Sequence, residues 1–360
     1  MMKKEQIEEL RKAIVQIATP QSTGTGLYIK SFDLIITNEH IVRSAKQVVI
    51  ENERIKSQLC KVLFIDEKYD LAFLSANDIG QEIKDIEFEE EAINVGSNIL
   101  AMGHPFGMQF SSSSGIVSND KHQIDGINYI KHDASLSSAN SGGPLINPDG
   151  RLVGINTFIF SKGQHQGFTL PVSDILEIYN AFKGVSKYPS QRCPSCHSMI
   201  EESKLDTSYC PNCGTHLSLI KDWEEHIPVG IYKTIEEMLE QLGFNVALSR
   251  RGPAQWYVER GSAGIKISYH EKSGLIEGDA YLVLLPDQNM EAIYRFLLKE
   301  NYDLDGLTFS VQGKHVVLSL LVYDQYFDID VSSRLFQKLF ETADHYDDVL
   351  VNQYAAKWGK

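Results

Sequence analysis

Short apolar runs broken by turn residues fill the chain from Gly24 to about Asn156. Glycine, asparagine, aspartate and serine separate these runs, and such residues favour turns over continuous helix. Many short strands with turn signals between them are typical of β-sandwiches and barrels. We therefore expect an all-β barrel domain in this part of the chain.

A glycine-flanked serine lies near the end of that region. The segment Asn140-Ser141-Gly142-Gly143-Pro144-Leu145 places Ser141 in a tight turn. A serine hydroxyl is a poor nucleophile until a base removes its proton, so a catalytic serine needs a histidine and a carboxylate elsewhere. His40 ends a strand-like run and Asp70 begins an apolar one. The chain order His, Asp, Ser is one of the known orders of a catalytic triad.

Each member of this set has a structural alternative. The chain has 11 histidines, and a lone histidine is usually structural. We expect structural or surface roles for the other protease-domain histidines, which are His104, His122, His132 and His165. The carboxylates that compete with Asp70 are Asp66, Asp78 and Asp85. Only Asp70 is followed by a Leu-Ala-Phe-Leu run that would carry it into the interior. We therefore predict the triad His40, Asp70 and Ser141.

Several motifs of this half of the chain come in a family's order. They are Gly24-Thr25-Gly26, Thr37-Asn38-Glu39-His40, Asp70-Leu71-Ala72, Gly103-His104-Pro105-Phe106-Gly107, Gly115-Ile116-Val117-Ser118 and Asn140-Ser141-Gly142-Gly143-Pro144-Leu145. Together they resemble the HtrA/Deg branch of trypsin-like serine proteases. The resemblance implies two six-stranded antiparallel barrels with the site between them. It also implies Ser141 as nucleophile, His40 as general base and acid, and Asp70 as the group that orients His40.

The resemblance further implies an oxyanion hole built from the backbone N–H groups of Ala139 and Ser141. Here the chain departs from the family, because Ala139 stands where the family normally has glycine. A positive φ at an alanine costs on the order of 1–2 kcal/mol, whereas losing one oxyanion donor costs about 2.7–4 kcal/mol of transition-state stabilisation. We therefore hypothesise that the resting loop is partly inactive and is ordered by substrate or a partner.

Three residues are candidates for the wall of the primary specificity pocket. Thr169 and Leu170 lie in a segment that resembles the family's pocket strand, and Ser135 lies six residues before Ser141. None of the three is acidic, so we expect cleavage after small or medium aliphatic residues rather than after lysine or arginine.

Composition excludes several function classes. The chain has 360 residues, 42% of them hydrophobic, and a net charge of -14. This charge would repel phosphate backbones, so we expect no nucleic-acid partner. No apolar run approaches the roughly 20 residues that cross a bilayer, so we expect no membrane partner. The N-terminal residues have acids where a secretory signal has its apolar core, which predicts a cytoplasmic protein.

Two C-x2-C pairs follow a polar stretch, Lys183 to Arg192, that we interpret as a linker. Cys193 and Cys196 are separated by 13 residues from Cys210 and Cys213. Two such knuckles suit a tetrahedral zinc site with four thiolates. Disulfides are the main alternative, and a reducing interior would disfavour them. We expect a structural Zn²⁺ in a module that resembles a zinc ribbon.

Helical and strand periods alternate over the last part of the chain, from Trp223 to Lys360. The predicted element order is αβββαββα. This order resembles a YbjN-like or secretion-chaperone-like α+β domain, which implies peptide binding or dimerisation rather than catalysis.

The sequence thus predicts a multi-domain chain: a trypsin-like double barrel over residues 1–183, a linker and four-cysteine zinc ribbon over 184–222, and an α+β recognition or dimerisation domain over 223–360. The leading interpretation is a serine endopeptidase that acts on protein or peptide substrates and is regulated by its C-terminal domain, with a homo-oligomer as a further expectation. The alternative is a pseudoprotease, a peptide-binding scaffold whose oxyanion hole stays closed.

Overall fold

The computed structural model describes residues 2–76, 79, 82–104, 110–136, 140–157, 167–185, 188–261, 263–288 and 290–358. The chain divides into two compact units, residues 1–226 and residues 227–360. Each unit has hydrophobic clusters of its own.

The first barrel of residues 1–226 contains six strands. They are β1 (Ile14–Ala18), β2 (Thr23–Ile29), β3 (Leu34–Thr37), β4 (Gln47–Glu51), β5 (Gln58–Asp66) and β6 (Leu71–Ser75). They are hydrogen-bonded in the order β5-β4-β1-β2-β3-β6, and pairing between β5 and β6 closes the ring. Nearly every residue of β1, β3 and β6 is buried, which explains why apolar residues dominate these strands.

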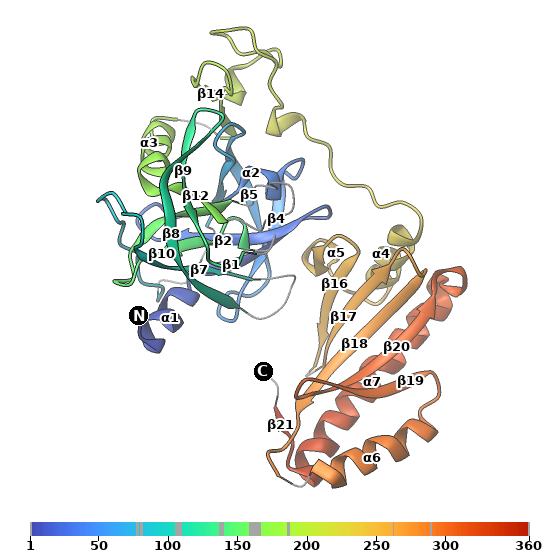
Figure 1. The fold of residues 1–360 in the computed structure, drawn as a ribbon. Helices are drawn as coiled ribbons and strands as arrows, with labels where there is room; N and C mark the ends of the chain where they lie inside the picture. The colour runs from blue at the N-terminus through green and yellow to red at the C-terminus, as the bar shows by residue number, and fades with distance from the viewer. Residues whose placement is uncertain are drawn as a thin grey trace. The chain divides into compact units, whose positions relative to one another are not determined.

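The second barrel also contains six strands. They are β7 (Asn98–Gly103), β8 (Ser111–Ile124), β9 (Ile127–His132), β10 (Pro144–Ile146), β11 (Leu152–Thr157) and β12 (Gly167–Pro171). They close in the order β10-β11-β12-β9-β8-β7. The two barrels are in contact where β7 packs against β1 and β2, and their strands overlap in the view of Figure 1. The predicted all-β double barrel is thus confirmed.

Three helices accompany the barrels. The helix α1 (Lys4–Arg11) lies near the N-terminus, and the short helix α2 (Glu39–Val42) follows β3 after one residue. The helix α3 (Val172–Phe182) follows β12, and its Val172, Ile175 and Ile178 are buried in the main core. This helix packs against β11 and β12.

The cysteine-rich segment belongs to the same compact unit. It contains β13 (Ser190–Arg192), β14 (Met199–Glu201) and the short 3-10 helices η3 (Glu202–Lys204) and η4 (Ile220–Asp222). The prediction of a linker as far as Arg192 is wrong for its last three residues, because β13 pairs in parallel with β5. The segment thereby extends the sheet of the first barrel.

Residues 227–360 form one sheet with helices. The strands are β15 (Arg250–Gly252), β16 (Gln255–Arg260), β17 (Ala263–His270), β18 (Leu275–Leu284), β19 (Leu307–Gln312), β20 (His315–Tyr323) and β21 (Lys357–Trp358). The helices are α4 (Ile231–Gln241), α5 (Val246–Ser249), α6 (Met290–Asp303) and α7 (Ile329–Tyr354), with the 3-10 helix η5 (Asp324–Tyr326). The predicted order αβββαββα is present with α5, β15 and β21 added, and α7 packs against β17, β18 and β20.

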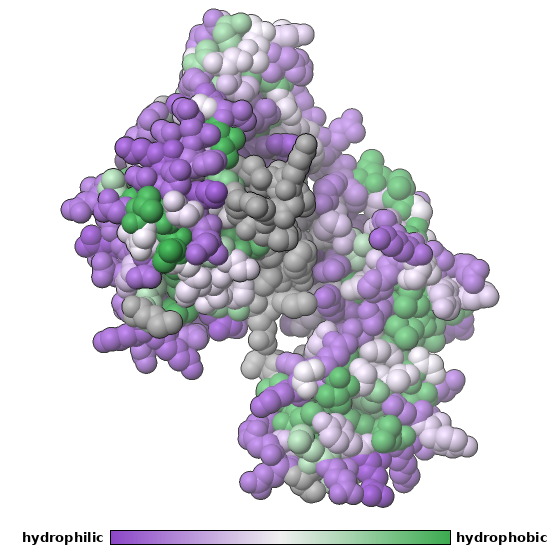
Figure 2. All heavy atoms as spheres, viewed as in Figure 1, coloured by the Kyte–Doolittle hydropathy of each residue, from purple (hydrophilic) through white to green (hydrophobic). Residues whose placement is uncertain are grey.

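The surface is mixed in character. On the face drawn in Figure 2, hydrophilic residues cover much of the surface and smaller hydrophobic areas lie between them. In the part of the chain that the structure describes, no helix combines the length and the apolar character that crossing a membrane requires.

Candidate active site

His40 and Asp70 are in direct contact. His40 lies in α2, directly after the buried strand β3, and Asp70 ends the turn between β5 and β6. The Nδ1 atom of His40 is 2.8 Å from Oδ2 and 3.0 Å from Oδ1 of Asp70, and the His40 backbone N–H also donates to Oδ1 at 3.0 Å. A carboxylate at Nδ1 holds the imidazole in the tautomer whose Nε2 can accept a proton. This pair therefore has the geometry of a base and its orienting group.

Two further side chains hold Asp70 in place. Asp70 has a positive φ of 50°, which is unusual for a residue with a side chain. The Nδ2 atom of Asn38 donates to the Asp70 carbonyl at 2.9 Å and to Thr157 Oγ1 at 2.7 Å. The Thr157 hydroxyl in turn donates to Asp70 Oδ2 at 2.9 Å. The carboxylate thus accepts from the His40 ring, the His40 backbone and Thr157.

The roles of Asn38 and Thr157 were not predicted from the sequence. Both are nearly fully buried polar residues at the ends of apolar strands, Asn38 after β3 and Thr157 at the end of β11. A buried polar side chain requires hydrogen-bond partners. Their roles could therefore have been inferred from one sequence feature, a polar residue at the end of a strand of mostly apolar residues.

The turn that holds Ser141 is tied to both barrels. The Ser141 carbonyl accepts from the backbone N–H of Thr25 at 2.9 Å, and the Gly142 N–H donates to the Asn156 carbonyl at 2.8 Å. Gly142 has a φ of 80°, and a Cβ atom there would clash with the Thr25 carbonyl and the Thr37 hydroxyl. The turn therefore requires glycine and lies against the segment that leads to His40.

The Ser141 side chain lies inside the protein. Ser141 is 1% exposed, and among the described residues its Oγ atom has no hydrogen-bond partner. The structure thus brings His40 and Asp70 into contact without a hydrogen bond from Ser141 to His40. In proteases without substrate this bond is often long and tightens only in the complex. The assignment of Ser141 as nucleophile stays a prediction.

The other predicted site residues divide between described and undescribed positions. Ala139 lies outside the described residues, so the oxyanion hole it would form with Ser141 stays a prediction. Thr169 and Leu170 lie in β12 and are buried, with Leu170 in the main core. Ser135 is exposed, and its N–H donates to Ser113 Oγ at 2.9 Å. The specificity pocket that these residues were expected to line likewise stays a prediction.

Three buried polar side chains near the Ser141 turn contact one another in sequence. Thr169 Oγ1 donates to Asn156 Oδ1 at 2.9 Å and lies 3.2 Å from Nε2 of His132. Burial lowers the pKa of His132 to about 4. This histidine is therefore neutral at physiological pH and structural, as the sequence predicted for it. The backbone of Asn156 also forms hydrogen bonds with Gly142 and Gly143. These linked polar residues therefore support the turn that holds Ser141.

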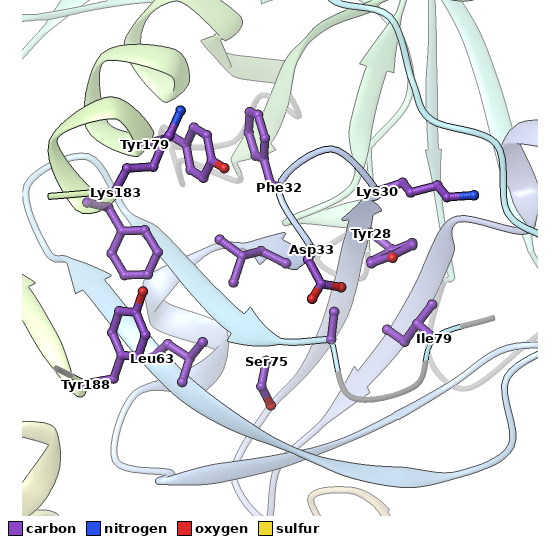
Figure 3. Close-up of a pocket in the computed structure, with 13 residues that line it drawn as sticks. Tyr28, Lys30, Phe32, Asp33, Leu63, Ser75, Ile79, Tyr179, Lys183 and Tyr188 are labelled. Carbon is purple, nitrogen blue, oxygen red and sulfur yellow. The ribbon is translucent and has the colours of Figure 1, made fainter. Parts of the chain in front are cut away.

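A separate cavity of about 780 Å³ lies beside the first barrel and α3. Aromatic side chains line much of it, including Tyr28, Phe32, Tyr179 and Tyr188, and Figure 3 shows them around the opening. None of His40, Asp70 and Ser141 lines this cavity. It is therefore distinct from the candidate active site.

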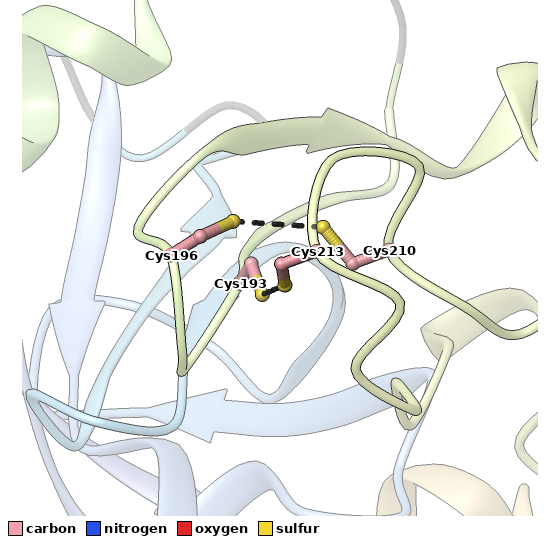
Figure 4. A group of neighbouring side chains, drawn as sticks. All are labelled: Cys193, Cys196, Cys210 and Cys213. Carbon is pink, nitrogen blue, oxygen red and sulfur yellow. Dashed lines mark hydrogen bonds between the residues drawn. The ribbon is translucent and has the colours of Figure 1, made fainter.

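The four cysteines of the two knuckles converge on one point. Their Sγ atoms all lie within 4.8 Å of one another, and those of Cys193 and Cys213 and of Cys196 and Cys210 are 3.6 Å apart, as Figure 4 shows. A disulfide requires about 2.05 Å between sulfurs. Four sulfurs about 2.3 Å from one zinc ion would be about 3.8 Å apart in a tetrahedron. The donor set and its spacing fit zinc.

Comparison with known proteins finds relatives of the first half of the chain. Residues 24–155 match the family model of the trypsin-like peptidase domain. A DegP-like probable periplasmic serine endoprotease of Hahella chejuensis is 32% identical over 169 residues, which cover 45% of this chain and 36% of that protein. A protein of the same name from Pseudomonas putida is 32% identical over 170 residues, covering 45% and 35%.

Among solved structures, the serine endoprotease from Yersinia pestis is 25% identical with a TM-score of 0.44, and the match covers 49% of this chain and 64% of that chain. The chain spans about a third of the length of the curated relatives it matches.

The relatives also correct one prediction. The N-terminal residues were expected to indicate a cytoplasmic protein, but these relatives are named periplasmic endoproteases, which contradicts that location. Without a cytoplasmic location, a reducing interior no longer counts against disulfides between the four cysteines. The first half of the chain carries a trypsin-like peptidase domain similar to those of DegP-like serine endoproteases.

Proposed function

We propose that the protein is a serine endopeptidase that cleaves protein substrates through an acyl-enzyme. The observation that carries this proposal is the contact between His40 Nδ1 and the Asp70 carboxylate at 2.8 Å, beside a turn that ties Ser141 to both barrels. The match of residues 24–155 to the trypsin-like peptidase domain supports it.

In the proposed reaction, Ser141 Oγ attacks the carbonyl carbon of the scissile bond while His40 Nε2 takes its proton. Asp70 keeps the proton on Nδ1 and stabilises the imidazolium that forms. His40 then protonates the leaving amine, and the acyl-enzyme retains the N-terminal part of the substrate. A water molecule, deprotonated by His40, releases this part and restores the Ser141 hydroxyl.

The alternative function is a pseudoprotease that binds peptides without cutting them. Two observations favour it: Ala139 occupies a position where the family has glycine, and the Ser141 hydroxyl has no partner among the described residues. A latent enzyme, active only after substrate or a partner orders the loop, shares both features.

One experiment separates the three cases. Purified protein is treated with a fluorophosphonate probe beside Ser141→Ala and Ala139→Gly, with casein as a test substrate. Labelling that is lost in Ser141→Ala and accompanies casein cleavage supports the endopeptidase. Absence of labelling in the wild type with a gain in Ala139→Gly indicates a latent enzyme. Absence in both, from folded protein, supports the pseudoprotease.

We also propose a structural Zn²⁺ held by Cys193, Cys196, Cys210 and Cys213. The sulfur spacing supports zinc over two disulfides, and the surrounding cluster of Ile200, Leu217 and Leu219 is too small to fix the segment alone. Metal analysis of the purified protein, together with a thiol count in denaturant before and after reduction, distinguishes the two. One zinc per chain with five thiols before reduction is expected; one thiol before reduction and five after would indicate two disulfides.

For residues 227–360 we propose a recognition or dimerisation role that regulates the peptidase. This proposal rests on the predicted αβββαββα order, whose resemblance to YbjN-like domains stays a prediction. Sedimentation at several protein concentrations tests whether the chain forms a homo-oligomer.

A further inference from the structure

The strand that leads into the first cysteine knuckle runs beside the strand that leads to Asp70. In the parallel pairing of β13 with β5, Ser190 lies opposite Phe64 and Gln191 opposite Ile65. Cys193 directly follows β13, and the turn that ends at Asp70 directly follows β5. The first cysteine of the proposed metal site and the carboxylate of Asp70 therefore follow two adjacent strands of one sheet.

Asp66, the last residue of β5, shapes the turn that ends at Asp70. Its side chain is 1% exposed, and its Oδ1 atom accepts from the backbone N–H groups of Lys68 and Tyr69, each at 3.1 Å. An aspartate that caps the next backbone N–H groups in this way fixes the course of a turn. Asp66 also pairs across the strands with Leu71, the residue after Asp70. The position of Asp70 thus depends on Asp66.

Arg192 joins this turn to the knuckle. Its Nη1 atom lies 3.6 Å from Asp66 Oδ2, and its Nε–H donates to the carbonyl of His197 at 3.2 Å. The guanidinium also lies over the Tyr69 ring, 5.3 Å from its centroid, and the side chain is only 11% exposed. This nearly buried cation therefore contacts a carbonyl of the knuckle, Asp66 at the end of β5 and Tyr69 of the turn. Its Nη2 atom also donates to Glu177 of α3 at 3.2 Å.

A second contact links the same two segments. Lys68 Nζ lies 3.1 Å from Nε2 of His197. His197 itself has a φ of 59° and donates its backbone N–H to the Cys193 carbonyl at 3.0 Å, so its position follows from the tight turn of the knuckle. A change in that turn would move both the carbonyl that binds Arg192 and the ring that contacts Lys68.

We propose that the four-cysteine site controls the position of the catalytic Asp70 through Arg192 and Asp66, so that the metal state of the ribbon sets the rate of the peptidase. Arg192 is a positioning residue in this proposal, since it contacts neither substrate nor reacting atoms. The expected change in rate rests on the proposed peptidase function. The connection between the cysteine site and Asp70 rests on the contacts alone.

The test uses the full chain and measures two quantities. Backbone hydrogen exchange of residues 66–71 is followed with zinc bound and after chelation, with residues 127–132 of β9 as an internal reference. The kcat and KM for a peptide substrate are measured in the same samples. The variant is Arg192→Met, and the matched control is Arg151→Met, which removes a half-exposed arginine 3.4 Å from Glu87 in the same unit.

Chelation of the wild type is expected to speed exchange in residues 66–71 and not in 127–132, and to lower kcat about tenfold at unchanged KM. A misplacement of catalytic groups by about 1 Å can cost about 100-fold in rate, and a smaller displacement is expected here. Arg192→Met should reproduce both effects with its zinc retained, and Arg151→Met neither. Should Arg192→Met fail to fold, Asp66→Asn replaces it, because the amide oxygen still accepts from Lys68 and Tyr69 while the charge that pairs with Arg192 is lost.

Exchange in residues 66–71 that stays unchanged on chelation, in a protein that has lost its zinc, would overturn the proposal. If no sample cleaves peptide, the proposed peptidase function fails on its own, and the exchange measurement still decides whether the ribbon and the catalytic turn are linked.

Discussion

At the scale of single residues, His132 shows how burial sets a charge state. Because the Thr169 hydroxyl donates to Asn156, it accepts from Nε2–H of His132, and Nδ1 has no hydrogen-bond partner among the described residues. Protonation would place a second, unpaired donor in the interior. Burial accordingly lowers the pKa of His132 from 6.5 to about 4.

This shift predicts a loss of stability in acid. The folded pKa lies below the unfolded one, so the stabilising contribution is fully present above pH 6.5 and is lost as pH falls towards 4. The size is up to about 3 kcal/mol, at about 1.4 kcal/mol per unit of pKa. Denaturant unfolding at pH 7 and pH 4.5 should show a smaller decline in His132→Gln than in the wild type.

The comparison must be made between variants because Asp66 acts in the opposite direction. Burial raises its pKa from 3.8 to about 6, so its contribution is present below 3.8 and is lost as pH rises through about 6. An equal pH dependence in His132→Gln and wild type would show that the histidine is not buried as described.

Gly142 provides a second prediction at this scale. Its positive φ costs any other residue on the order of 1–2 kcal/mol, and a Cβ atom would also clash with the Thr25 carbonyl. Gly142→Ala should therefore destabilise residues 1–226 and abolish fluorophosphonate labelling. Gly96→Ala is the matched control, because Gly96 has a φ of 86° with nothing within 4 Å of the added atom. Equal losses of stability in both variants would mean that the clash is absent.

At the scale of elements, one buried carboxylate holds the cysteine-rich segment together. Glu202 of η3 is fully buried, and its oxygens accept from the backbone N–H groups of Ile220 at 2.9 Å and Lys221 at 2.8 Å. The Gln191 side chain donates to it at 3.0 Å. Glu202 thus connects β13, η3 and η4.

Glu202→Gln should weaken this connection, because the amide nitrogen donates where the carboxylate oxygen accepted and leaves a buried N–H unpaired. Such a loss costs about 1–3 kcal/mol. Unfolding followed by the fluorescence of Trp223, next to η4, would measure it, with the exposed Glu224→Gln as control. A midpoint no lower than that of the control would contradict the role of Glu202.

Elements with a clear period were predictable from the sequence, and those fixed by distant partners were not. The helix α3 and the barrel strands follow from their own apolar spacing. In contrast, β13 is three residues long and polar, and it is a strand because it pairs with β14 on one side and with the edge of β5 on the other. The site divides in the same way: His40 and Asp70 were predictable from motifs, whereas the hydrogen bond of Thr157 to Asp70 and the ion pair of Arg192 with Asp66 join residues more than 80 positions apart in the chain.

At the scale of the whole molecule, the N-terminal residues show why the location was predicted wrongly. Their acids were interpreted as evidence against export, yet α1 has a structural use: Ile7 and Leu10 pack against the main core, and Arg11 lies over the Phe110 ring, 5.1 Å from its centroid. A segment that stabilises the barrel domain carries charges for its exposed side. The composition of this segment therefore does not indicate in which cellular compartment the protein lies.

The division into two compact units makes a prediction for the entire chain. The hydrophobic clusters of residues 1–226 and of residues 227–360 share no residue. Each unit should therefore unfold in its own cooperative transition. The proposed zinc stabilises only the unit that binds it, because a ligand shifts the equilibrium of the state it binds.

The tryptophans separate these transitions. Trp223 donates to Ser218 Oγ at 2.9 Å within the first unit, and Trp256 donates to Glu236 at 3.2 Å within the second. Chelation should lower the denaturant midpoint reported by Trp223 and leave the midpoint reported by Trp256 unchanged. In Trp223→Phe only the chelator-independent transition should remain visible. A single transition that shifts as a whole on chelation would show instead that the two units unfold together. The stabilities of the two units would then be coupled, and residues 227–360 could regulate the peptidase through this coupling.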